Sequence, residues 1–201
     1  MSRVYLCSDW HFCHDQPFIY ESRGFKSVDE MNEVIITKHN SIVMPEDDVI
    51  VLGDLMLNDN KKGVECINQL NGNLHIIAGN HCTANRIQEY VNLKIGTEFW
   101  GYAVPYKYRK YSFYLSHYPT LTSNLDEDKP LKAKVINLCG HAHTQDRWAD
   151  WDKGLIYHVE MDAHNCYPVL LDDIIEEIFT EYYDSNDEKF YSLIRKYTVK
   201  N

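Results

Sequence analysis

Short apolar runs alternate with segments of helical periodicity in the first half of the chain. The runs VYLC (4–7), VIVL (49–52) and LHIIA (74–78) have the length and the aliphatic character of buried strands. Between them, two longer segments repeat apolar residues at the spacing of one helical face: Met31, Val34, Ile35 and Ile42 in the first, and Val64, Ile67 and Leu70 in the second. Strands that alternate with helices in this way predict an α/β fold around a largely parallel sheet.

Both predicted helices carry boundary signals. Ser27 and Glu30 have the spacing of a capping box, so the first helix should begin directly after Ser27. Gly72 suits the C-terminal cap of the second helix, because glycine adopts the left-handed conformation at little cost. The two helical segments are therefore expected within residues 27–43 and 61–72.

The second half of the chain changes from helical to strand-like patterning. Residues 102–119 alternate around a polar turn, which predicts a hairpin, and the segments 134–144 and 154–162 contain further apolar strands. Polar loops are expected at 124–130 and 145–154. Together these strands predict a second sheet.

The C-terminal part returns to helical patterning. We expect helices over 170–183 and 188–197, separated by a polar DSND break. One apolar face of the first should pack on the sheet, with a homodimer contact as the alternative: Ile174, Ile175, Ile178, Phe179 and Tyr182. Because the chain contains no linker, repeat or low-complexity tract, we expect a single domain spanning residues 1–201.

Composition restricts the partners and the compartment. The 201 residues include 30 acidic and 20 basic side chains, for a formal net charge of −10, so a long nucleic acid is not the expected partner. A small anionic substrate remains compatible, since bound cations make a cleft locally positive. No apolar stretch reaches the roughly 18 residues of a membrane span, and the six cysteines lack zinc-type spacing. We therefore expect a cytoplasmic protein with reduced thiols and no membrane partner.

Side chains that can bind metals follow most of the predicted strands. In chain order they are Asp9, His11, Asp54, Asn80, His81, His117, His141 and His143. Residues two apart point to the same side of an extended segment, so Asp9 with His11, and His141 with His143, can face one centre. A carboxylate can bridge two cations, and imidazoles with an amide oxygen suit Mn, Fe, Ni or Zn. Five such strand ends predict a metal centre at one edge of the fold.

The motifs DWH, GD, GNH, SHYP and GHAH occur in this order, and with them the chain resembles the calcineurin-like metallophosphoesterase family. The resemblance covers essentially the whole chain and is strongest to small bacterial and phage-type members. It implies a four-layer α-β-β-α sandwich of two packed mixed sheets flanked by helices. It also implies the following site residues: Asp9, His11 and His143 on one metal, Asn80, His117 and His141 on the other, Asp54 as the bridge, and His81 acting on the substrate.

The resemblance further implies a metal-dependent phosphoric ester hydrolase with two divalent cations, of which Mn²⁺ is favoured. Two cations roughly 3.5 to 4 Å apart can hold a bridging hydroxide and clamp phosphoryl oxygens during in-line displacement. A histidine beside them, here His81, can protonate the leaving alkoxide. We expect a phosphodiesterase for a small nucleotide-like phosphoester, in the host-cell cytoplasm if the chain is phage-encoded.

Three alternative functions remain open from the sequence. A phosphomonoesterase would use the same centre, and a nuclease acting on short ends is disfavoured by the acidic composition. A non-catalytic protein-binding scaffold is the alternative of another class. Scaffolds of this kind typically lack ligands or the substrate histidine, whereas all eight residues are present here.

Other polar residues near the motifs are candidate substrate contacts. Arg23 has the donor fork that suits a phosphate, with a surface salt bridge as the alternative. His14 could contact substrate or support a ligand, or it could be a solvated loop residue, and Asn80 could contact substrate as well as metal. The remaining histidines match no ligand position and are interpreted as surface or core residues: His39, His75, His158 and His164.

Two tryptophans and two cysteines also lie near the motifs. Trp148 and Trp151 could stack on a nucleobase together with Arg147, although packing of their loop on the sheet is the favoured interpretation. Cys82 stands where many relatives have an acidic residue that could orient His81. Oxidation of Cys13 or Cys82 could affect activity, but inert packing is the favoured interpretation for both.

Overall fold

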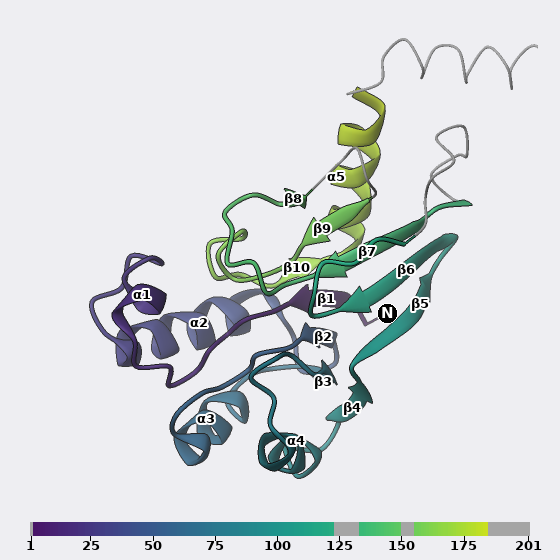
Figure 1. Cartoon of the computed structure of the whole chain (residues 1–201). Helices are drawn as coiled ribbons and strands as arrows, with labels where there is room; N and C mark the ends of the chain where they lie inside the picture. Colours follow the sequence, from purple (N-terminus) through teal and green to yellow (C-terminus); the bar gives the residue numbers. More distant parts are fainter. Residues whose placement is uncertain (1, 123–132, 150–154, 185–201) are drawn as a thin grey trace, which may run out of the picture.

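A computed structural model describes residues 2–122, 133–149 and 155–184 (Figure 1). The strands are β1 (Val4–Cys7), β2 (Asp48–Leu52), β3 (Asn73–Ile77), β4 (Glu98–Gly101), β5 (Ala103–Tyr108), β6 (Tyr111–Ser116), β7 (Val135–Cys139), β8 (Trp148–Ala149), β9 (Ile156–His158) and β10 (Val169–Leu170). The helices are α1 (Pro17–Tyr20), α2 (Val28–Ile42), α3 (Asn60–Ile67), α4 (Ala84–Val91) and α5 (Leu171–Asp184). The strands form two mixed sheets with flanking helices, which confirms the predicted fold class.

The first sheet has the strand order β10-β1-β2-β3-β4. Strands β1 to β4 run parallel, as the alternation of strands and helices predicts, and β10 pairs antiparallel with β1. The sequence did not predict the two edge strands. β4 is only partly buried and β10 has two residues, so neither produces a clear apolar run.

The second sheet has the strand order β5-β6-β7-β9-β8. β5 and β6 form the predicted hairpin, and their register ends at the pair Tyr108 and Tyr111 around a turn in which Arg109 has a φ of 52°. The prediction of a continuous loop over 145–154 is wrong, because Trp148 and Ala149 form β8. Trp148 pairs with Tyr157 of β9, and this edge pairing has no signal in a polar sequence.

The observed boundaries of α2 and α3 confirm one signal and correct the other. The Ser27 hydroxyl accepts a hydrogen bond from Glu30 N at 3.2 Å, so α2 begins where the capping box predicts. The prediction that Gly72 caps α3 is wrong, since α3 ends at Ile67 and a turn follows it. Gly72 has a φ of 90°, and a Cβ there would approach Val49 Cγ2 at 2.9 Å, so this glycine permits close packing before β3.

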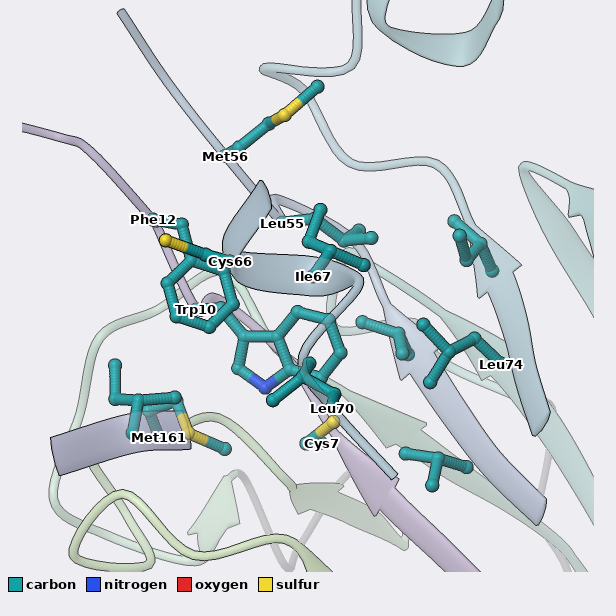
Figure 2. Packing of buried hydrophobic residues seen from close by; sticks show 14 of the residues in the cluster. Cys7, Trp10, Phe12, Leu55, Met56, Cys66, Ile67, Leu70, Leu74 and Met161 are labelled. Atoms are coloured by element: carbon teal, nitrogen blue, oxygen red, sulfur yellow. The ribbon is translucent and has the colours of Figure 1, made fainter. Parts of the chain in front are cut away.

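Two apolar cores lie on opposite faces of the first sheet. Consecutive residues of a strand point to opposite faces, so Tyr5 and Cys7 of β1 face α2, α3 and α4, whereas Val4 and Leu6 face the second sheet. Trp10 is fully buried in the helix-side core, among side chains of α3 and the surrounding loops (Figure 2). The segment that follows β1 is thereby fixed by apolar packing.

α5 packs against β1 and β10 and contributes to the core between the sheets. Ile174 and Ile178 are buried as predicted, but Phe179 is 46% exposed, so its assignment to the packed face is wrong. The helix presents a narrower apolar stripe than the periodicity suggests.

The segments 124–130 and 188–197, Trp151 and the side chain of Tyr182 lie outside the described residues. Within the described ranges, no helix has the length and apolar character needed to cross a membrane.

Candidate metal centre

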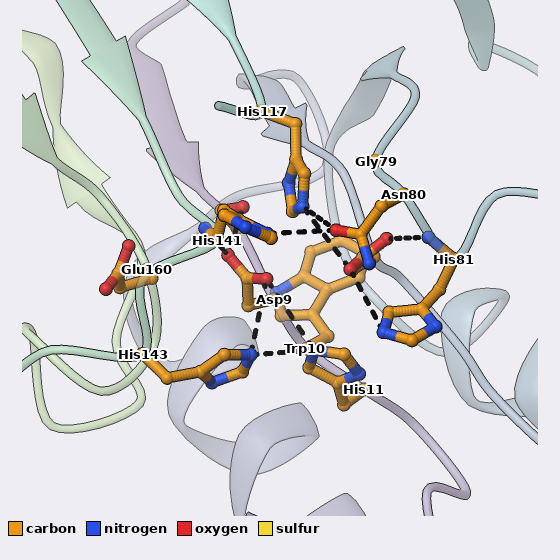
Figure 3. A network of polar contacts seen from close by, with 12 residues as sticks. Asp9, Trp10, His11, Gly79, Asn80, His81, His117, His141, His143 and Glu160 are labelled. Carbon is orange, nitrogen blue, oxygen red and sulfur yellow. Dashed lines mark hydrogen bonds and ion pairs between the residues drawn. The ribbon is translucent and has the colours of Figure 1, made fainter. Parts of the chain in front are cut away.

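The five polar segments meet at one edge of the two sheets. Asp9 and His11 follow β1, Asp54 follows β2, and the segment from Asn80 to His81 follows β3, which is parallel to both. His117 follows β6, and the two histidines of the GHAH motif follow β7, which is parallel to β6. Because parallel strands end at the same edge, these side chains converge (Figure 3).

Asp9, His11 and His143 form the first cluster. The Nε2 atoms of His11 and His143 are 3.1 Å apart, and Asp9 Oδ1 lies 3.6 Å from the first and 3.7 Å from the second. Asp9 is fully buried, and its Oδ1 has no hydrogen-bond partner among the residues that the structure describes. A buried carboxylate oxygen that accepts no hydrogen bond costs free energy, which a bound cation would offset. The three side chains offer electron pairs around one point, and this arrangement fits a cation.

The second cluster contains Asn80, His117 and His141. Asn80 Oδ1 lies 2.7 Å from His117 Nε2 and 2.9 Å from His141 Nδ1. Asp54 Oδ2 lies 3.4 Å from His117 Nε2, and Asp9, Asp54 and His117 offer atoms that all lie within 4.8 Å of one another. The carboxylates thus lie between the two clusters, and the donor set fits two adjacent divalent cations.

Hydrogen bonds to the backbone hold these donors in orientation. His117 Nδ1 lies 2.8 Å from the carbonyl oxygen of Leu52, which can only accept, so Nδ1 carries a proton and Nε2 is the atom directed at Asn80 and Asp54. His141 N donates to Asp9 Oδ2 at 2.9 Å, and Ser8 Oγ lies 2.6 Å from the same oxygen. These bonds leave Asp9 Oδ1 directed at the first cluster.

Electrostatics keep both carboxylates charged. Burial opposes ionisation of Asp9, but the neighbouring His11, His117 and His143 outweigh this effect and lower its pKa to about 2. Burial also opposes ionisation of Asp54, yet its hydrogen bond with His117 and the attraction between them lower its pKa. Two charged carboxylates at neutral pH provide the negative charge that a pair of cations requires.

Backbone strain is concentrated at the same residues. A positive φ occurs at Asp9 (59°), His11 (52°), Asp54 (51°), His141 (74°) and His143 (49°), a region that non-glycine residues seldom adopt. Such conformations cost about 1 to 3 kcal/mol each and persist where the surrounding structure enforces them. Their occurrence at five of the seven predicted ligands supports a functional site at this edge.

Glycines allow the strand ends to approach one another. A Cβ at Gly79 would collide with Asp54 Oδ1, and one at Gly140 would collide with Ser8 Oγ and Asp9 Oδ2. Gly53 has a φ of 99°, and a Cβ there would lie 2.6 Å from His117 Nδ1. Glycine is therefore required beside the carboxylates for steric reasons.

Asp162 is a site residue that sequence reasoning missed. Its Oδ2 accepts a hydrogen bond from His143 Nδ1 at 3.0 Å, which leaves His143 Nε2 free to face Asp9. Asp162 is part of the MDAH segment, but it is not itself at a predicted ligand position, so its role depends on the tertiary structure. Burial opposes its ionisation, but His143 and Arg23 outweigh this and lower its pKa.

The side-chain donors of Arg23, a predicted substrate contact, are engaged within the protein. The side chain is buried and bonds Asp162 with Nε at 3.1 Å and with Nη2 at 2.8 Å. Its remaining N–H groups bond the carbonyl oxygens of Asp9 and Trp10 and approach the sulfur of Met31. Arg23 thus ties Asp162 to the backbone of the ligand segment, and the surface salt bridge is excluded.

Asp162→Asn should lower the affinity for a divalent cation about 10- to 100-fold, because loss of such a support disorients the ligating histidine. Isothermal titration with Mn²⁺ measures the effect, after circular dichroism has verified that the variant is folded. Asp172→Asn is the matched control, since Asp172 pairs with Arg109 on another face. Equal affinities for wild type and Asp162→Asn would contradict the role of Asp162.

Glu160 is a second buried carboxylate near the GHAH segment (Figure 3). Its Oε1 accepts a hydrogen bond from Thr144 N at 2.7 Å, and its Oε2 lies 3.0 Å from His158 Nδ1. Glu160 therefore anchors the chain directly after His143. His158 belongs to this support, consistent with its interpretation as a core residue.

His81 and His14 line the side of the centre nearest α1. His81 N donates to Asp54 Oδ1 at 2.9 Å, and its half-exposed ring places Nε2 4.0 Å from Asp54 Oδ2. The buried His14 ring lies 5.2 Å from that of His11 and 6.3 Å from that of His81. Cys82 accepts from Gly79 N at 3.2 Å, and burial raises the pKa of its thiol, so it does not replace the missing acidic residue.

The other predicted candidates contribute no atom to the two clusters. Trp148 packs edge-on against Tyr157 with ring centroids 4.8 Å apart, in agreement with the packing interpretation. Arg147 pairs with Glu177 at 2.9 Å. His39 and His164 are buried, and His75 stacks on Trp100 beside the edge strand β4.

Comparisons with known proteins agree with this geometry. Residues 2–192 match the sequence model of the family described as calcineurin-like phosphoesterase. The chain is 33% identical over 181 residues to the uncharacterized protein MJ1445 of Methanocaldococcus jannaschii, covering 89% of this chain and 92% of that protein.

Solved structures provide a further comparison of the fold. A protein of unknown function from Aquifex aeolicus, AQ665, matches with a TM-score of 0.65 and 21% identity over 88% of this chain and 99% of the other. A structure described as a novel archaeal phosphodiesterase has a TM-score of 0.47 and 14% identity over 81% and 86% of the two chains, too low to assign its substrate here. The family match over most of the sequence shows that the chain belongs to the calcineurin-like phosphoesterase family.

Proposed function

We propose that the chain is a phosphodiesterase with a binuclear metal centre that hydrolyses a small nucleotide-like phosphoester. The observation that carries the proposal is the convergence of seven ligand-type side chains from five strand ends, with Asp54 between the clusters. Asp9, His11 and His143 would hold one divalent cation, and the other would be held by the remaining set: Asn80, His117 and His141. Asp54 would contact both, and Mn²⁺ is the favoured ion.

The cations would supply Lewis acidity toward phosphoryl oxygens and would lower the pKa of a water for attack on phosphorus. The residues of the chain position the reaction. Asp54 and Asp9 would hold the positive charge at the strand ends. The hydrogen bond from Ser8 Oγ fixes Asp9, and the hydrogen bond from His117 Nδ1 to the Leu52 carbonyl oxygen fixes His117. Trp10 excludes water from beneath the centre, because it is fully buried there.

His81 is the proposed acid for the leaving group. Its backbone N is fixed on Asp54, and its 41% exposed imidazole places Nε2 4.0 Å from Asp54 Oδ2. An imidazole in this position can donate a proton to the leaving alkoxide and stabilise the charge that develops on phosphorus. His14 lies behind His81 and is proposed to support its orientation by ring packing.

Two exposed aromatic side chains support a nucleotide-like substrate. Tyr118 is 52% exposed and lies edge-on to His141 with ring centroids 4.6 Å apart. Phe18 is 67% exposed and lies edge-on to His14 at 5.8 Å. Exposed rings beside a phosphate site provide faces on which a base can stack.

The test of the proposed function compares a phosphodiester, bis(p-nitrophenyl) phosphate, with the monoester p-nitrophenyl phosphate. We expect a higher kcat/KM for the diester with Mn²⁺ and loss of both activities after chelation, with recovery when Mn²⁺ is restored. If turnover of the monoester dominates, the substrate is a phosphomonoester rather than a diester, and the proposed metal centre is retained. Absence of turnover with every divalent cation would favour a non-catalytic scaffold.

A further inference from the structure

A pocket of about 430 Å³ lies directly beside the first cluster. His143 and Asp162 form the wall shared with the metal centre, and Lys38 of α2 contributes to the opposite lining together with Asn165. Arg147, from the segment before β8, also lines it. The volume lies within the range of about 300 to 1,000 Å³ that small-molecule sites occupy.

The charge of this pocket is opposite to that of the whole chain. Its lining includes the cations Arg23, Lys38 and Arg147 against the single carboxylate of Asp162, whereas the chain has a formal net charge of −10. Asp162 is already paired with Arg23 through two hydrogen bonds. Lys38 and Arg147 therefore supply the positive charge of the lining, Arg147 with Glu177 as its partner.

The two cations differ in their partners, because Arg147 forms an ion pair with Glu177 and Lys38 bonds only uncharged groups among the described residues. Lys38 Nζ donates to the carbonyl oxygen of Asn165 at 2.7 Å and lies 4.8 Å from the ring centroid of Tyr167, and no carboxylate among the described residues forms an ion pair with it. Arg147 pairs with Glu177 through Nη1 at 2.9 Å, but its side chain is 46% exposed, so water screens this ion pair and a phosphate can compete for the guanidinium. An ammonium and a guanidinium at one pocket suit a phosphate group.

We infer that this pocket binds a second phosphate group of the substrate, so that the preferred substrate is a phosphodiester carrying a further phosphate. The inference rests on the proposed function, because the scissile phosphate would lie at the centre that His143 adjoins. Lys38 and Arg147 are the specificity-determining residues. A diester without a further phosphate would leave both cations without this partner.

The kinetic test uses two substrates that differ by one group: thymidine 5′-(p-nitrophenyl phosphate) and its 3′-phosphorylated form. We expect the wild type to prefer the 3′-phosphorylated substrate in kcat/KM by about 10-fold or more, the effect of one charge-assisted contact. Lys38→Met and Arg147→Met should each reduce this ratio, and together they should abolish it. Lys107→Met, at an exposed position on β5, is the control and should keep the ratio. A wild-type ratio of one would overturn the inference.

A binding measurement separates failure of this inference from failure of the proposed function. With Mn²⁺ present, thymidine 3′,5′-bisphosphate should bind about 10-fold more tightly than thymidine 5′-monophosphate, and Lys38→Met should remove the difference. If neither diester is hydrolysed but this difference is found, the pocket is supported and the catalytic proposal fails. If both diesters are hydrolysed and the two nucleotides bind equally, the proposed second phosphate site is contradicted. The proposed phosphodiesterase activity is then still supported.

Discussion

Asp54→Asn should lower phosphodiester turnover by at least about 10³-fold, a loss of roughly 4 kcal/mol of transition-state stabilisation. Asp54 is buried, one of its oxygens accepts from His81 N at 2.9 Å, and the other lies 3.4 Å from His117 Nε2. Asparagine preserves the size of the side chain but removes its charge and one of its two oxygen ligands. The variant should therefore remain folded while it loses the group proposed to join the two cations.

The measurement for Asp54→Asn combines steady-state hydrolysis of bis(p-nitrophenyl) phosphate with the metal content after dialysis against Mn²⁺. Asp172→Asn again provides the matched substitution, since this carboxylate of α5 pairs with Arg109 of the turn between β5 and β6. The control should retain activity and metal. Turnover by Asp54→Asn within about 10-fold of the wild type would exclude a bridging role for this carboxylate.

His81→Gln should lower kcat about 10²- to 10⁴-fold, the usual contribution of a positioned acid or base. Its backbone N would still donate to Asp54, so binding of Mn²⁺ should remain close to that of the wild type. This combination distinguishes a residue that acts on substrate from a metal ligand. His75→Gln, which changes a histidine beside Trp100, is the control.

The leaving group determines how large the loss in His81→Gln becomes. Nitrophenolate leaves without help from an acid, whereas an alkoxide requires a proton, so the loss should be greater for an alkyl ester than for a nitrophenyl ester. Steady-state kinetics on a matched pair of methyl and p-nitrophenyl esters measures this difference. Equal losses for both esters would assign His81 to stabilisation of charge on phosphorus rather than to proton donation.

The location of the site was predictable because local patterns determine it. β1, β2 and β3 are mostly apolar, and the polar groups of Asp9, Asp54 and Asn80 follow shortly after each strand ends. Since parallel strands share an edge, strand order alone brings these groups together. The capping box at Ser27 is likewise a local signal, and the structure contains its hydrogen bond.

The features that could not be predicted depend on distant partners. Asp162 is bonded to Arg23, 139 positions earlier in the chain, and only this pairing shows that the arginine is occupied. The end of α3 before Gly72 and the exposure of Phe179 depend on what packs against those segments. Residue type and spacing therefore do not determine these features, because each depends on which distant residues bury or pair with the segment.

The stoichiometry of metal binding tests the central claim most directly. Titration of the metal-free wild-type chain with Mn²⁺, followed by elemental analysis after dialysis, counts the ions that each chain retains. The two clusters around Asp54 predict two Mn²⁺ per chain, with magnetic coupling between them in the electron paramagnetic resonance spectrum. Retention of a single uncoupled ion, or of none, would contradict a binuclear centre.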